Sequence, residues 1–433
     1  MFADITPFYS KERMDMAAGR RRRKRFFSTL ITIVFVLFLL AGALYAGVYL
    51  GRLIFDVTPG ETQQMIPSAS SLPELPEAYL SLRDPNAEKH SDSFYYGFLN
   101  AEEQRVYECL LAACLDFREE MRISPLVSEA EFLRANSALS LDHPEFYWAG
   151  SSTKYYVNRD NMVTSVTYEM NGDEREILDK IDALTTPVCE SLPDREYDAY
   201  RMLYEYVIDL ADYDGAHPEQ GQTIKSVFVN HRSVCAGYSR AFEYLCRKAG
   251  LECVYVTGTA VLNNGENGSH AWNLIRIQDQ WYWCDVTWGD PVFEGQGEGE
   301  MNYNYFCVSD RELTKEHVID YNPSDLPVEY PSCPDDSLNW YVLNQAYFET
   351  YDEETMRQYV TWRASEGMEK IVMKFSNQEE LGKAVYELIE QEKIFRFLND
   401  AGMMCHSLSY VKFEGISAMW IVLHPDEVLP SVN

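Results

Sequence analysis

The chain has 433 residues, enough for two or three domains that each bury their own core. Hydrophobic residues make up 46% and aromatic residues 14%, a composition that excludes an intrinsically disordered protein. The formal net charge is −31, and subtracting the +5 of residues 1–25 leaves −36 for the rest, so we expect no nucleic-acid partner.

The N-terminal segment has the pattern of a membrane anchor. Residues 1–25 end in six consecutive basic residues and are expected to form a cytoplasmic head. Residues 26–50 carry no charge and are long enough to cross a bilayer as a helix, which places the rest of the chain outside the cytoplasm. The alternative is a signal peptide cleaved near Ala41-Gly42-Ala43, but the apolar run exceeds the usual 7–15 residues of such a peptide, so we favour a retained anchor.

Two further segments precede the most informative part of the chain. Residues 51–92 are rich in proline and polar residues and predict an extended spacer. Residues 93–190 predict an N-terminal α/β preface, with a capped helix starting at Asn100 and Glu103 and strands near 155–157 and 162–170. His143 precedes Pro144, so we expect a capping or turn role for it rather than catalysis.

Helical spacing continues over residues 194–210, and the following aspartates, 209, 212 and 214, do not have EF-hand spacing. We expect a solvated helix end there rather than a calcium site. Beyond the proline-rich stretch 323–334, residues 336–433 predict a small C-terminal α+β domain. Its expected elements are strands at 370–375, 408–413 and 418–423 and a helix at 378–392.

Chemistry is concentrated between residues 226 and 293. Cys235 opens a helical pattern that ends at Gly250, so its thiol is expected at a helix N-terminus, where free N–H groups and the helix dipole stabilise a thiolate. The same N–H groups could hold the oxyanion of a tetrahedral intermediate. Ala236 and Gly237 would allow a substrate close to the backbone. A lone cysteine is more often structural, so the interpretation depends on its partners.

The partners come from an expected hairpin, strands 270–277 and 281–288 joined around Gln278-Asp279-Gln280. With a two-residue turn, opposed residue numbers have an odd sum, as do those of His270 and Asp285, so both side chains should share one face as diagonal neighbours about 7–8 Å apart at Cα. A three-residue loop without a bulge would separate them. The pattern therefore predicts a Cys-His-Asp triad of Cys235, His270 and Asp285.

These residues resemble those of bacterial members of the transglutaminase-like superfamily. The matching segments are V-C-A-G-Y-S-R-A-F (234–242), H-A-W-N (270–273) and W-Y-W-C-D-V-T-W-G-D (281–290), with looser matches at 209–214 and 305–306. The resemblance implies an α+β, cysteine-peptidase-like fold with the nucleophile helix packed on an antiparallel sheet, over a catalytic domain at 191–325. It also implies Cys235 as nucleophile, His270 as base and Asp285 as its partner. Asp279-Gln280 departs from the Asp-Gly common in relatives.

The expected function is that of an extracytoplasmic thiol enzyme acting on amide bonds of surface proteins or wall peptides. It would act as a peptidase or amidase if water takes up the acyl group, or as a transglutaminase if an amine does. The alternative is a non-catalytic binding or scaffold module. We expect no cofactor and no metal. No C-x-x-C pair is present, which removes the usual zinc-ribbon and thioredoxin interpretations, and disulfide pairing among the ten cysteines stays open. Candidate cleft residues, the first three also candidate oxyanion donors, are Tyr213, Tyr238, Trp272 and Trp288.

Overall fold

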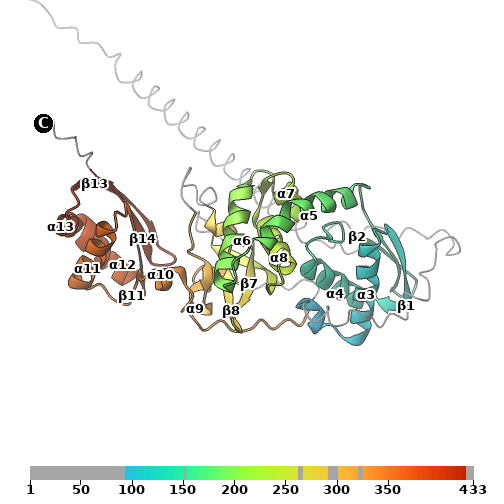
Figure 1. Cartoon of the computed structure of the whole chain (residues 1–433). Helices are drawn as coiled ribbons and strands as arrows, with labels where there is room; N and C mark the ends of the chain where they lie inside the picture. Colours follow the sequence, from blue (N-terminus) through green and yellow to red (C-terminus); the bar gives the residue numbers. More distant parts are fainter. Residues whose placement is uncertain (1–92, 151–152, 262–266, 291–300, 320–324, 426–433) are drawn as a thin grey trace, which may run out of the picture. The chain divides into compact units, whose positions relative to one another are not determined.

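The computed structural model describes residues 93–150, 153–261, 267–290, 301–319 and 325–425 (Figure 1). The expected head, transmembrane helix and spacer lie outside these residues. Within the described ranges, no helix is both long and apolar enough to cross a membrane. All described residues fall in one compact unit.

The first part of the described chain is a three-stranded antiparallel sheet of order β1-β3-β2 with two helices. The predicted capping box of Asn100 and Glu103 is confirmed, and Ser128 with Glu131 forms a second one, so side chains satisfy part of the first-turn N–H groups of both helices. His143 is the C-cap of the second helix, as expected of a turn residue. The elements are η2 Tyr95–Phe98, α3 Ala101–Leu115, β1 Glu120–Ser128, α4 Glu129–Asp142, β2 Thr153–Val157 and β3 Met162–Tyr168.

The central part is a five-stranded sheet of order β10-β6-β7-β8-β9, antiparallel throughout. Its strands are β6 Cys253–Val261, β7 Asn267–Ile277, β8 Gln280–Cys284, β9 Phe306–Val308 and β10 His317–Val318. Before it in the chain come α5 Glu174–Glu190, α6 Glu196–Leu210, β4 Asp212–Tyr213, η3 Pro218–Gln220, α7 Ile224–Phe228, β5 Arg232–Ser233 and α8 Cys235–Lys248. Two short helices complete it, η4 Thr287–Gly289 and α9 Asp310–Leu313.

Helix α8 packs against β6 and β7, and side-chain bonds fix it there. Ser239 Oγ donates to the Ala271 carbonyl over 2.9 Å, and Asn273 Nδ2 donates to the Ser239 carbonyl over 3.0 Å. Asn273 therefore links the helix to strand β7. Ile177 and Ile181 of α5 share one buried core with α6, α7 and α8, so α5 adds to this core although its residues lie within the predicted preface.

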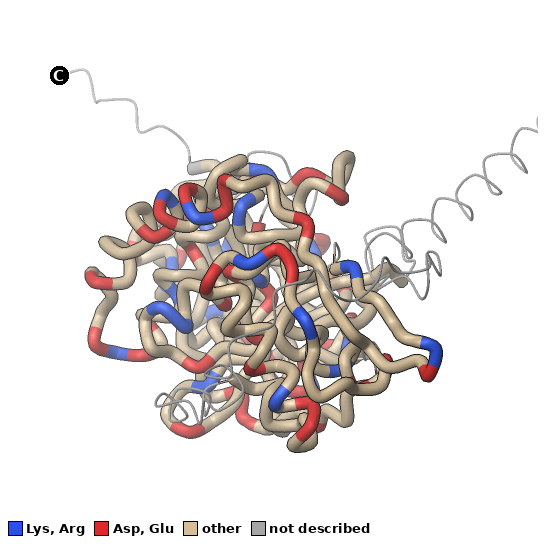
Figure 2. Tube along the Cα trace, turned by 90° about the vertical axis from the view of Figure 1, so that its right-hand side faces the viewer, with Lys and Arg blue, Asp and Glu red and all other residues tan. Residues whose placement is uncertain are grey.

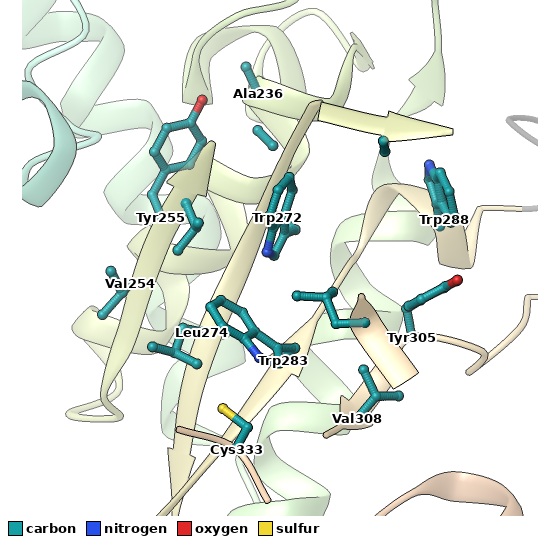
Figure 3. Packing of buried hydrophobic residues seen from close by; sticks show 14 of the residues in the cluster. Ala236, Val254, Tyr255, Trp272, Leu274, Trp283, Trp288, Tyr305, Val308 and Cys333 are labelled. Atoms are coloured by element: carbon teal, nitrogen blue, oxygen red, sulfur yellow. The ribbon is translucent and has the colours of Figure 1, made fainter. Parts of the chain in front are cut away.

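A second core includes the aromatic residues of the central sheet. Figure 3 shows Trp272, Trp283 and Tyr305 among its buried side chains. Trp272 is fully buried and Trp283 nearly so, and the Trp283 indole donates to Asp310 Oδ1 over 2.8 Å. These large rings occupy core positions, where they contribute much buried apolar area.

The C-terminal part is a four-stranded sheet of order β11-β12-β14-β13 with helices (Figure 1). The three predicted strands are present, and the predicted helix from residue 378 continues as a π-helical segment and ends at Glu392, where φ is 56°. The elements are α10 Trp340–Leu343, β11 Tyr347–Phe348, α11 Glu353–Ser365, β12 Lys370–Phe375, α12 Gln378–Ala384, η6 Val385–Glu390, α13 Lys393–Asp400, β13 Cys405–Phe413 and β14 Ala418–Pro425. Figure 2 shows acidic residues spread along the trace with Lys and Arg among them.

Candidate active site

Cys235 is the first residue of α8, as the helical pattern predicts. Its N-cap, Val234, is extended and offers no side-chain cap, so the first N–H groups of the helix are available for an anion. The parallel pairing of β4 with β5 holds the segment before the helix, with Tyr213 opposite Ser233. Unlike most cysteines of the chain, Cys235 is only partly buried, which lets a reagent or substrate reach its sulfur.

Gly237 has a different role from the expected one. A Cβ at this position would clash with Ser233 Oγ and the Gly221 carbonyl, and the residue is buried. Its missing side chain therefore lets the preceding loop pack against the first turn of α8, rather than opening the backbone to a substrate. Ala236 is also buried. The role expected for Gly237 is therefore replaced by one in loop packing, whereas the approach of a substrate to the N–H groups at the start of α8 stays a prediction.

The hairpin places His270 and Asp285 together. Asn273 pairs with Cys284 and Ile277 with Gln280, which leaves Gln278 and Asp279, both with positive φ, as a two-residue turn. The predicted strand 281–288 is shorter, because β8 ends at Cys284 and the chain turns into η4. His270 Nε2 donates to Asp285 Oδ2 over 2.7 Å.

Asp285 has two further donors. The backbone N–H of Trp288 donates to Oδ1 over 3.1 Å, and His317 Nε2 donates to Oδ2 over 3.0 Å. Burial disfavours the charged form of Asp285, but the opposing charge of His270 and the hydrogen bonds of both histidines outweigh it and hold the pKa far below its usual range. The carboxylate is therefore ionised and acts only as an acceptor.

His270 is equally buried, and burial disfavours its imidazolium. The Asp285 carboxylate and a hydrogen bond with Cys235 outweigh burial and raise the pKa of His270 to about 10. Because Nε2 is taken by Asp285, Nδ1 is the ring nitrogen left for the sulfur. The predicted side chains thus lie in the order sulfur, imidazole, carboxylate, as a thiol nucleophile with an oriented base requires.

His317 was not predicted. It lies in the short strand β10, 32 residues after Asp285, and a two-residue strand has no periodicity that sequence analysis could detect. Its ring centroid lies 4.5 Å from that of Trp288 and 5.0 Å from that of Trp272. Only the pairing of distant strands brings this histidine to the site.

Two of the candidate cleft residues are engaged elsewhere. The Tyr238 hydroxyl, fully buried, donates to the Ala211 carbonyl and lies 2.7 Å from Asp290 Oδ2. Trp272, shown in Figure 3, is also fully buried. Its ring lies 6.0 Å from that of His270. Within the described residues its indole N–H has no hydrogen-bond partner. Both side chains are therefore part of the buried core next to the site.

The other two candidates lie closer to the reacting groups. Tyr213 is half-buried, and its pKa is raised first by burial and then by the negative charges of Cys235 and Asp285, so its hydroxyl lies within electrostatic reach of the sulfur. Trp288 is mostly buried, with its ring 5.5 Å from that of His270, and its backbone N–H donates to Asp285 Oδ1. Trp288 thus lies next to the His270 ring, and Tyr213 lies close enough to Cys235 to interact with its charge.

The described residues contain one group with the donor types of a metal site, His270, Asp285 and His317, whose ligand atoms lie within 4.8 Å of one another. Hydrogen bonds account for this grouping, since each histidine donates to the same carboxylate oxygen. We therefore do not identify them as metal ligands. All ten cysteines are free, and eight of them are buried.

The site has the arrangement found in one class of protein, in which a cysteine begins a helix and a His-Asp pair lies at the adjoining sheet. Residues 182–286 match the model of the Transglutaminase-like superfamily, and this segment is a transglutaminase-like domain. The α+β fold expected from the resemblance, with helix α8 on an antiparallel sheet, is confirmed for this part of the chain.

Curated relatives match over the same part. The chain is 30% identical over 92 residues to Kyphoscoliosis peptidase of Mus musculus, covering 19% of this chain and 14% of the relative. It is 28% identical over 105 residues to Kyphoscoliosis peptidase of Homo sapiens, covering 22% and 16%. The chain thus spans less than a fifth of the length of either relative.

Solved structures show weaker similarity. A TGase is 15% identical, covering 39% of this chain and 50% of that chain, with a TM-score of 0.22. The periplasmic domain of TgpA from Pseudomonas aeruginosa is 17% identical, covering 31% and 57%, with a TM-score of 0.22. Structural similarity this low adds no support to the family match.

Proposed function

We propose that the chain is a thiol enzyme that transfers acyl groups from amide bonds. The observation that carries the proposal is the Nε2–Oδ2 hydrogen bond of 2.7 Å between His270 and Asp285, made by an imidazole that also interacts with Cys235 at the start of α8. A buried structural cysteine would need neither the partial exposure of Cys235 nor an oriented base.

The chemistry follows from these positions. The Cys235 thiolate attacks the amide carbon, and N–H groups at the start of α8, with the Tyr213 hydroxyl as a second donor, stabilise the oxyanion. His270 gives its proton to the leaving amine as the C–N bond breaks, which leaves a thioester on Cys235. The imidazole then takes a proton from the acceptor, which attacks the thioester and releases the thiol. Water as acceptor gives hydrolysis, and a lysine amine gives a crosslink.

The proposed location is the outer face of the cytoplasmic membrane, with residues 26–50 as a single span and peptides or proteins of the cell surface as substrates. The apolar run and the basic block before it support this proposal. Protease added to intact cells should then digest the chain beyond residue 50 and spare the basic head. Protection of the body until the cells are lysed would contradict the location.

The nucleophile can be tested without knowing the substrate. Cys189 is a matched control, since it is partly exposed like Cys235 but its pKa is raised by burial. In the full-length protein at pH 6 to 7, iodoacetamide should alkylate Cys235 well before Cys189, as mass spectrometry of the peptides would show. Equal or faster labelling of Cys189 would contradict the assignment. Incubation of the labelled and unlabelled protein with surface extract and a primary-amine probe would then separate transfer from hydrolysis.

A further inference from the structure

Strand pairing places His317 and His270 on one face of the central sheet. Gly258 of β6 is opposite His270 on one side of the strand, and Ala260, two residues on, is opposite His317 on the other side. Residues two apart on a strand share a face, and directly opposed residues do too. His317 therefore faces the same side as His270, although 47 residues separate them in the sequence.

Gly258 is part of the reason that β10 can lie so close. A Cβ at this position would clash with the Val318 carbonyl and approach the Trp272 ring to 2.7 Å. The missing side chain thus leaves room for the chain that carries His317. A backbone hydrogen bond also joins β6 to the residue before β10: the Glu316 carbonyl accepts from the Val261 N–H over 2.9 Å.

The protonation of His317 follows from its partner. Asp285 is an ionised acceptor, so His317 Nε2 must carry the hydrogen of their 3.0 Å bond. Burial outweighs the Asp285 charge and lowers the pKa of His317, which leaves the ring neutral with a bare Nδ1. That Nδ1 is buried and has no partner among the described residues. His317 is therefore a one-donor ring directed at Asp285.

The surroundings of His317 give it no other polar task. Aromatic rings of Trp272, Trp288 and Tyr305 pack around it, with centroids at 4.5 to 5.0 Å. The charged or titratable groups that act on it are Asp285, His270 and Glu316, and Glu316 is itself bonded to the Tyr305 hydroxyl. If His317 served only for packing, an apolar aromatic ring could take its place.

We propose that His317 is a positioning residue for the triad: it donates its Nε2–H to Asp285 Oδ2 and so holds the carboxylate in the orientation that accepts from His270. This inference rests on the proposed function of Cys235, His270 and Asp285. Without His317, Asp285 keeps His270 and the Trp288 N–H as donors but loses the bond that restrains Oδ2 from the side of β10. The Cys235 thiolate–His270 imidazolium pair is then less favoured over the neutral thiol and imidazole.

Two substitutions separate the donor from the ring. His317→Phe keeps an aromatic ring and removes the N–H, whereas His317→Gln keeps an N–H donor near the position of Nε2. Leu313→Ala, at a fully buried residue of the neighbouring helix α9 that has no bond to Asp285, controls for loss of stability alone. The measurement is the rate of Cys235 alkylation by iodoacetamide from pH 5 to 10 in the full-length protein.

At pH 6 we expect His317→Phe to slow alkylation by roughly tenfold or more, equivalent to about one pKa unit of the ion pair. The deficit should shrink to within about threefold near pH 10, where any accessible thiol is ionised. His317→Gln should recover most of the rate at pH 6, and Leu313→Ala should retain the wild-type profile.

The proposal is overturned if His317→Phe has the wild-type profile, or if Phe, Gln and Leu313→Ala all slow the reaction equally at every pH. If Cys235 of the wild type is not alkylated ahead of Cys189, the proposed function itself fails, and the two failures are thereby distinguished.

Discussion

At the scale of single residues, the site is built around one carboxylate. Asp285 is fully buried and accepts from His270, His317 and the Trp288 N–H, so its charge is compensated by three donors. A buried charge is costly unless it is paired and hydrogen-bonded. The donors therefore keep the carboxylate ionised, and the ionised carboxylate in turn orients the imidazole toward Cys235.

If the triad acts as a unit, its substitutions should not be additive. Cys235→Ala should abolish turnover, and His270→Ala should be nearly as severe because the imidazole serves as both base and acid. Asp285→Asn should be milder, yet in another enzyme's triad the equivalent change costs about 10⁴ in turnover by favouring the wrong tautomer. The Cys235→Ala/His270→Ala double variant should be no worse than either single one. Measured turnover that survives His270→Ala would show that another base operates.

The titration of His270 gives a second prediction, best measured in Cys235→Ala, where the thiol does not titrate. Asp285 still raises the pKa of His270 above its ordinary 6.5 in this variant, but to less than the wild-type value of about 10. The imidazolium thus stabilises the fold fully below pH 6.5, and this contribution is lost as pH rises through the folded pKa. Urea unfolding from pH 6 to 8, below the range in which the cysteine thiols of the unfolded chain ionise, should show the onset of this loss, and adding Asp285→Asn should remove it. A flat profile in Cys235→Ala would contradict the ion pair.

At the scale of elements, the sequence predicts what local patterns encode. The helix at Cys235 and the shared face of His270 and Asp285 could both be predicted, because the first depends on periodicity and the second on the parity of one short hairpin. His317 could not, because its place depends on β10 pairing with β6 across a long connection. The role of Gly237 could not either, because the atoms that crowd it come from the loop before α8.

The crowding at Gly237 predicts a large effect for a small change. Gly237→Ala would force a Cβ into Ser233 Oγ and the Gly221 carbonyl, so unfolding should be easier by about 1–3 kcal/mol. Gly382→Ala is the matched helical control, since a Cβ there meets nothing within 4 Å, and it should stabilise by about 0.5–1 kcal/mol. Chemical denaturation of both variants is the measurement. Equal effects at the two sites would show that the loop moves away from α8.

The turn between β7 and β8 uses residues that are poorly suited to it. Gln278 and Asp279 have φ of 49° and 65°, the left-handed values that asparagine and glycine adopt more readily. Gln278→Asn should therefore raise the free energy of unfolding by about 0.5 kcal/mol. The same exchange at Gln358, inside helix α11, should lower it, because asparagine is a weaker helix former. Thermal melts would show opposite shifts, and shifts of the same sign would contradict the explanation.

At the scale of the whole molecule, the central part is tied to its neighbours by buried polar contacts. The Tyr95 hydroxyl of η2 donates to the Tyr255 carbonyl of β6 over 2.6 Å. On the C-terminal side, the Trp420 indole donates to the Tyr341 hydroxyl over 3.1 Å, and that hydroxyl donates to Asn304 Oδ1 over 2.7 Å. If one of these parts unfolded alone, buried polar groups of its neighbour would lose their hydrogen-bond partners. We therefore expect these parts to unfold cooperatively.

A buried ion pair between the central and C-terminal parts gives the last prediction. Lys374 of β12 and Glu312 of α9 are both almost fully buried, and their side chains approach to 2.6 Å. Lys374→Met removes one charge and leaves the Glu312 carboxylate with Lys315, at 2.9 Å, as its remaining partner. Breaking a buried pair from one side costs about 3–5 kcal/mol, because the other charge stays buried, and Lys315 should reduce this to the lower end.

The control is the removal of both charges. Lys374→Met with Glu312→Leu leaves no unpaired ion, and replacing a buried pair by apolar side chains is often neutral or stabilising. The double variant should therefore unfold at a higher urea concentration than Lys374→Met alone. If the two variants unfold at the same concentration, the cost comes from lost packing between α9 and β12 rather than from the carboxylate left behind. A single transition in both variants would show that the C-terminal sheet and the central part remain one cooperative unit.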